Sequence, residues 1–145
     1  MGWKAPDDLA HGGAGGERQP MSSLTTVAAI LITLALVFYS VGVWAEHLAR
    51  YLKPWHVVFF WTGFLFDTSG TLAMELIKPG FDWASSHTVT GQIALWLMLV
   101  HAAWATKVVR KGSEGARARF HRLSLVVWGI WLVPYIGGMF LGMVK

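Results

Sequence analysis

Four long apolar runs, separated by short polar segments, dominate the chain. They cover residues 24–45, 55–77, 88–106 and 123–144, and only the second contains acidic residues, Asp67 and Glu75. Each run approaches the ~20 residues that a helix needs to cross a hydrocarbon core of roughly 30 Å. The runs are continuously apolar instead of alternating, and no hairpin turn signal interrupts them, which argues against transmembrane strands.

The runs predict an all-α fold, an integral membrane, up-and-down four-helix bundle with helices over residues 23–46, 55–77, 87–107 and 121–144. Short connections force consecutive helices to pack antiparallel, so the first helix lies diagonal to the third and the second diagonal to the fourth. We expect residues 1–22, which are rich in glycine, to be a disordered amino-terminal tail before a transmembrane domain of residues 23–145. Met21 is an alternative start of the chain.

Composition agrees with this fold. The chain is 54% hydrophobic and 14% charged, and its mean hydropathy is +0.48. Its 145 residues leave no room for an additional soluble domain. Because there is no cysteine, disulfides, thiolate metal sites and covalent c-type haem attachment are excluded.

Basic residues are concentrated in two of the three connections. The first connection holds Arg50 and Lys53, whereas the second offers only Lys78. The third holds most of the rest: Lys107, Arg110, Lys111, Arg117, Arg119 and Arg122. This bias predicts that the first and third connections are cytoplasmic and that both termini lie outside. Topology and anionic lipid therefore explain the sequence pI near 9.7, and a nucleic-acid partner is not expected.

Two histidines mark one face of the third run. His87 and His101 are separated by Gly91, Ala94 and Met98, and at about 100° per residue all five stay within roughly 40° of one line. An imidazole inside a bilayer needs a partner, so we interpret His101 as a cofactor ligand or a proton-relay group. His87 lies at the outer boundary of the membrane.

The second run carries a similar face, with His56, Gly63, Asp67, Gly70 and Met74 at helical spacing. On such faces glycine leaves room for a flat macrocycle, and imidazole or thioether can bond its metal. Four histidines are expected toward the cytoplasmic side: His47, His56, His101 and His121. His47, His56 and His121 lie at helix ends, and for each of them extension of the side chain to the lipid headgroups is an equally good interpretation. For Met74 and Met98 the alternative is ordinary packing.

Asp67 is the only carboxylate expected near the membrane centre. We expect it to make a structural hydrogen bond, with Thr68, Ser69 or Thr71 as local partners; a bond from a histidine or a bound proton are the alternatives. In the last run, Gly138 and Gly142 form a GxxxG pair. Packing within the bundle is the favoured interpretation of this pair, and a homodimer contact is the alternative.

Several segments together resemble the HsmA family of small bacterial membrane proteins, over about residues 25–143. The matching pieces are residues 39–46, 55–56 with 60–64, 67–71 with Met74, His87 through Trp104, and 120–121 with 131–139. The resemblance implies a four-helix protein of the bacterial cytoplasmic membrane that binds haem within the bilayer, sequesters it and supports haem tolerance. It implies four candidate iron ligands, His56, His87, His101 and His121, with Asp67 supporting them. The two helix faces add Gly63, Gly91 and Met98 as residues expected beside the cofactor.

From these observations we expect one b-type haem between helices. His101 is the first axial ligand, and the second comes from His56 or His121. A second haem would use His87, with Met74 as a thioether of suitable position. That arrangement makes a di-haem electron-transfer or quinone-linked cytochrome the main functional alternative.

Other functions compete with haem sequestration. A weaker resemblance to CtaM-like cytochrome oxidase assembly proteins implies a role in maturing a haem-copper oxidase. Copper or zinc binding by the gathered histidines, and proton carriage by Asp67 and His101, are further alternatives. The chain has no nucleophile elbow, P-loop or HExxH arrangement, so whether it is an enzyme stays open, and a non-enzymatic role is favoured.

Overall fold

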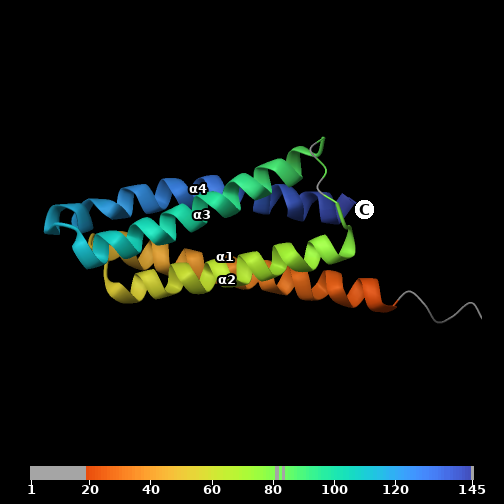
Figure 1. The fold of residues 1–145 in the computed structure, drawn as a ribbon, viewed down its shortest axis with the longest axis horizontal. Helices are drawn as coiled ribbons and strands as arrows, with labels where there is room; N and C mark the ends of the chain where they lie inside the picture. Colours follow the sequence, from red (N-terminus) through yellow and green to blue (C-terminus); the bar gives the residue numbers. More distant parts are fainter. Residues whose placement is uncertain (1–18, 81, 83, 145) are drawn as a thin grey trace, which may run out of the picture.

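The computed structural model describes residues 19–80, 82 and 84–144, and it is almost entirely helical over this part of the chain. Its helices are α1 (Gln19–Ala49), α2 (Pro54–Ile77), α3 (Ser86–Lys111) and α4 (Glu114–Val144), and the described residues contain no strand (Figure 1). All four helices are long and apolar enough to cross a membrane. The prediction of an all-α chain with four candidate membrane spans is confirmed.

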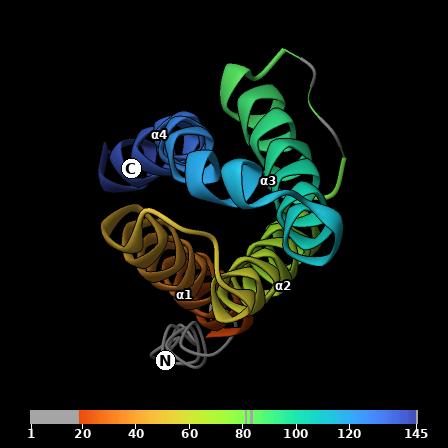
Figure 2. The ribbon, with the colours of Figure 1, turned by 90° about the vertical axis from the view of Figure 1, so that its left-hand side faces the viewer.

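The helices are arranged as a four-membered bundle, seen end-on in Figure 2. Backbone contacts join α1 to α2, α2 to α3, α3 to α4 and α4 to α1, whereas the diagonal pairs make none within the described part of the chain. The predicted diagonal placement is therefore confirmed. Figure 1 shows the short connections at one end, with the second connection and the carboxyl terminus at the other.

All four helices begin earlier than expected, α2 and α3 by one residue and the other two by several. α1 starts at Gln19, and the remainder of the expected tail, residues 1–18, lies outside the described residues. α4 starts at Glu114 instead of residue 121, because Ser113 caps it by accepting a hydrogen bond from the Ala116 N–H at 3.2 Å. Much of the basic segment before residue 121 is consequently the first two turns of a helix.

Glycine brings α1 and α2 close together, and this pair makes the most extensive backbone contact of the bundle. A Cβ at Gly63 would lie 2.5 Å from Tyr39 Cδ1, and one at Gly70 would lie 2.5 Å from Ile32 Cγ1. Side chains of α1 thus occupy the positions that side chains on α2 would otherwise fill. Small residues serve this purpose in membrane helices, where association depends on close packing.

The core consists of two apolar clusters stacked along the bundle axis. The first lies at the end with the short connections and contains Val43, Leu52, Val57, Phe60, Ala102, Ala105, Val108 and Phe120. The second lies nearer the middle and contains Ala35, Tyr39, Ala94, Met98, Val127 and Trp131. Every helix contributes to these two clusters, so the clusters hold all four together.

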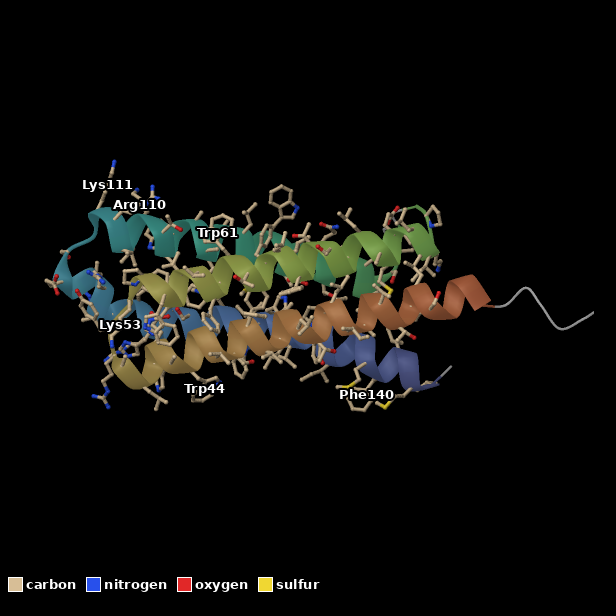
Figure 3. The ribbon with its side chains drawn as sticks, turned by 90° about the horizontal axis from the view of Figure 1, so that it is seen from below. Trp44, Lys53, Trp61, Arg110, Lys111 and Phe140 are labelled. Atoms are coloured by element: carbon tan, nitrogen blue, oxygen red, sulfur yellow. The ribbon has the colours of Figure 1, made fainter. Side chains whose placement is uncertain are left out.

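Hydrogen bonds join the first connection to the first turn of α4. Arg117 Nε and Nη2 donate to the carbonyl of Leu52 at 3.0 and 2.8 Å, and the Leu52 N–H donates to the Arg117 carbonyl at 3.1 Å. The guanidinium also lies 4.3 Å from the centre of the Tyr51 ring, whose hydroxyl donates to Glu114 at 2.8 Å. Figure 3 shows Lys53, Arg110 and Lys111 at this same end, which is the basic end of the molecule.

Candidate functional site

Polar side chains from all four helices are buried in the bundle. They are Glu46 from α1, His56 and Asp67 from α2, His101 from α3 and Ser124 from α4. All except Asp67 lie in the half of the bundle nearer the basic end, around the first apolar cluster. Because buried polar groups are normally hydrogen-bonded, the partners of each group indicate what it does.

Among the described histidines, His101 lies farthest from the ends of its helix, and it has no polar partner. Its side chain is 3% exposed, and both ring nitrogens are buried without a hydrogen-bond partner among the described residues. The ring lies between Phe60 of α2, at a centroid distance of 4.8 Å, and Phe120 of α4, at 5.2 Å. An unsatisfied buried polar group typically costs about 1–3 kcal/mol, so this imidazole is expensive for the fold to keep.

His56 is fully buried at the start of α2, and its position is explained by a backbone contact. Its Nδ1 accepts a hydrogen bond from the Lys53 N–H at 3.0 Å, which satisfies an otherwise unbonded amide at the helix start. A neutral imidazole carries one proton, so Nε2 must hold it when Nδ1 accepts. His56 Nε2, which is also buried without a partner, is therefore an N–H donor and not a lone-pair ligand.

His121 shows the opposite arrangement. Its Nδ1 lies 2.8 Å from the Ala118 carbonyl, which only accepts, so Nδ1 carries the proton. In the neutral ring, Nε2 then keeps its lone pair. This is the usual state of a metal-ligating histidine, whose other nitrogen donates to a carbonyl or carboxylate.

Sequence reasoning placed His47 toward the cytoplasmic side but did not single out its neighbour Glu46, at the end of α1. Glu46 is fully buried, with Oε2 accepting from the Ser124 hydroxyl and Oε1 without a partner. The His47 ring lies 5.4 Å from the His121 ring, and its Nδ1 is also buried without a partner. The spacing of Tyr39, Val43 and Glu46 at i, i+4 and i+7 was the available signal, because it places the carboxylate on the buried face of α1.

The four predicted iron ligands do not converge as their side chains now lie. No group of three or more histidine, aspartate or glutamate side chains within the described residues is placed to hold a metal ion. His87 lies at the far end from the basic connections, where its exposed ring packs on α4: a Cβ at Gly138 would be 2.8 Å from His87 Cε1. Gly138 therefore packs within the bundle, while the space at Gly142 is open.

Asp67 makes a structural hydrogen bond, as expected, but not with the expected partners. Its Oδ2 accepts from Trp131 Nε1 of α4 at 2.8 Å and from the Tyr39 hydroxyl of α1 at 3.3 Å. Of the three expected partners, Ser69 and Thr71 donate to backbone carbonyls four residues earlier, and Thr68 Oγ1 is buried without a hydrogen-bond partner among the described residues. Asp67 consequently ties α2 to two other helices.

The glycines and methionines on the histidine-bearing faces of α2 and α3 have different surroundings. The Tyr39 ring takes the space at Gly63, so this glycine leaves no room for a macrocycle in the present packing. Met98 is fully buried within the second apolar cluster. Of the three glycines on these two faces, Gly63 and Gly70 are packed against α1, whereas Gly91 faces open space.

The arrangement offers nitrogen ligands in apolar surroundings. His101 and His121 each present a nitrogen that no protein group uses, and the aromatic rings beside His101 exclude water from it. Neutral imidazoles of this kind bind haem iron and other transition metals. No protein-family model, curated protein or solved structure matches this chain.

Proposed function

We propose that the chain is a multi-pass protein of a bacterial cytoplasmic membrane that binds and sequesters a b-type haem between its helices. The membrane part of the proposal rests on the four long apolar helices. The orientation rests on the basic end, which the positive-inside rule assigns to the cytoplasm, with both termini outside. The bacterial source and the sequestering role come from the resemblance to the HsmA family.

The observation that carries the haem proposal is the deep, partnerless imidazole of His101. An apolar side chain would pack at this position without leaving two nitrogens unsatisfied. The buried histidine therefore favours a functional role, such as binding a ligand. The donor chemistry fits haem iron, which bonds a neutral imidazole through a lone pair. Room for the porphyrin requires Phe60 and Phe120 to turn away from the ring that they now cover.

Hydrogen bonding separates the two candidates for the second axial ligand. His121 has its lone pair on the nitrogen that remains available, whereas His56 has a proton there and uses its lone pair to hold Lys53. His101 and His121 are therefore the residues that we expect to hold the iron. Bound haem would supply a redox-active iron, and in sequestration the protein's own task is to keep that iron ligated and away from water.

A di-haem electron-transfer protein is the second candidate function. His87 lies at the opposite end of α3, fourteen residues and about 21 Å from His101 at 1.5 Å per residue. Its ring is exposed, and the neighbouring position Gly91 faces open space. These two features favour a second ligand site near the outer face, which a redox titration with two centres would reveal.

Absorption spectra of the detergent-purified protein, oxidised and reduced, test the proposal directly. We expect a Soret band with sharp reduced α and β bands in the wild type, which His101→Ala abolishes and His121→Ala shifts. His56→Ala is the matched control, since it removes an equally buried histidine but should leave the bands unchanged. A colourless wild type that also fails to bind added haem would overturn the haem proposal and favour copper, zinc or proton carriage.

A further inference from the structure

A groove of about 260 Å³ runs between the start of α2 and the end of α3 at the basic end. Its lining residues are Pro54, Val57 and Trp61 of α2 and Thr106, Val109 and Arg110 of α3. Trp61 Nε1 donates to Thr106 Oγ1 at 2.9 Å, and this hydroxyl donates in turn to the Ala102 carbonyl at 2.8 Å. The polar groups inside the groove are thus satisfied, which leaves an apolar interior.

Polarity changes along the groove from one end to the other. Arg110 is exposed at the rim with Val109 beside it, Val57 lies about one turn into α2 from Pro54, and Trp61 lies deepest, next to Thr106 and toward the membrane centre. Figure 3 shows Arg110 close to the end of the bundle and Trp61 farther along it. A partly exposed tryptophan below a ring of basic residues is typical of the membrane interface.

The charge around the rim is positive. None of the lining residues is acidic, and Lys53 and Lys107 lie next to lining residues in the sequence. α2 begins at Pro54 and α3 ends at Lys111, so opposite ends of two helix dipoles meet at the rim, and the net positive charge comes from the basic side chains. The nearest acidic side chain along α4, Glu114, accepts the hydroxyl of Tyr51.

We propose that one acidic phospholipid of the cytoplasmic leaflet occupies this groove. Its phosphate binds Arg110, and one acyl chain lies over Val57 and Val109 as far as Trp61. The order of charge outside and apolar surface inside matches the order of groups in a phospholipid, and basic pockets between membrane helices bind acidic headgroups. The inference depends on the membrane placement of the bundle and not on haem binding.

Native mass spectrometry of the detergent-purified full chain tests this site, with dioleoyl phosphatidylglycerol as the probe and dioleoyl phosphatidylcholine as the neutral comparison. We expect one tightly bound phosphatidylglycerol, and about fivefold weaker binding after Arg110→Gln. Lys111→Gln is the matched control, because it removes the same charge from the next residue, outside the groove lining. Val109→Phe fills the apolar floor without changing charge, and it should weaken binding as well.

The outcomes separate a built site from general electrostatic attraction. Equal weakening by Arg110→Gln and Lys111→Gln, or equal binding of the two lipids, would overturn the proposal. Displacement of the lipid by inorganic phosphate would also contradict it, because the acyl chain would then contribute nothing. If the wild type shows the haem spectrum but binds no phosphatidylglycerol, the lipid proposal fails alone. If it binds phosphatidylglycerol but shows no haem spectrum, the haem proposal fails alone.

Discussion

Trp131 of α4 donates a hydrogen bond of 2.8 Å to Asp67 of α2, across the diagonal of a bundle in which these two helices make no backbone contact. The Tyr39 hydroxyl donates to the same carboxylate oxygen from α1. A single side chain near the middle of α2 thus connects three helices. Its bonds are enclosed by the second apolar cluster, which contains both donors.

Removing this carboxylate should destabilise the bundle. Asp67→Ala leaves the Trp131 and Tyr39 donors buried without an acceptor, at a cost of about 1–3 kcal/mol for each donor. Asp67→Asn keeps an acceptor oxygen and should lose much less. Thermal unfolding in detergent measures both, and equal losses for the two variants would mean that the negative charge, not the acceptor, is what the bundle needs.

Substitution by alanine should change the free energy of unfolding differently at two glycines, Gly63 on α2 and Gly91 on the adjacent helix α3. Gly63→Ala places a Cβ 2.5 Å from the Tyr39 ring, and we expect it to lower the free energy of unfolding by about 1–3 kcal/mol. Gly91→Ala meets open space and should be neutral or stabilising by up to about 1 kcal/mol, because alanine favours helix. Detergent unfolding curves compare the two, and destabilisation by Gly91→Ala would show that this open space is needed.

The helices were predictable because each depends on a local pattern. A run of about twenty apolar residues is sufficient to indicate a membrane helix, and Pro54 and Ser85 lie at the starts of α2 and α3 as the rules for helix ends require. The early start of α4 also had a local signal, the capping Ser113. It was missed because the arginines that follow were interpreted as loop.

The partners of the buried polar groups were not predictable in the same way. Asp67 has hydroxyl neighbours within four residues, and nothing in the local sequence excludes them as partners. Its actual donors, Tyr39 and Trp131, are 28 and 64 residues away in the sequence and belong to other helices. Tyr39 fills the space at Gly63 because of how α1 and α2 approach each other, which periodicity alone does not fix. Such contacts depend on the rotation of each helix about its axis.

The hydroxyl of Tyr51 should titrate at unusually high pH. Its hydrogen bond to Glu114 raises its pKa above the ordinary value of 10, because ionisation would break the bond and place two negative charges together. The bond between the first connection and the start of α4 therefore persists at pH 10 and is lost as the pH rises through the raised pKa. Phenolate absorbance measures this pKa, and subtracting the titration of Tyr51→Phe removes the signal of the other tyrosines. The titration midpoint of Tyr51 should be lower in Glu114→Ala than in the wild type. An unchanged midpoint would exclude Glu114 as the cause.

His56 should prove to be a structural residue of the helix start. Its Nδ1 accepts the Lys53 N–H, so His56→Ala leaves that amide without its acceptor and should lower the free energy of unfolding by about 1 kcal/mol. The reduced haem spectrum should stay as in the wild type, because the available nitrogen of His56 carries a proton. Unfolding curves and spectra of the same preparation measure both effects. A loss of the α band equal to that of His101→Ala would instead make His56 the second ligand, and it would require the ring to give up its bond to Lys53 when haem binds.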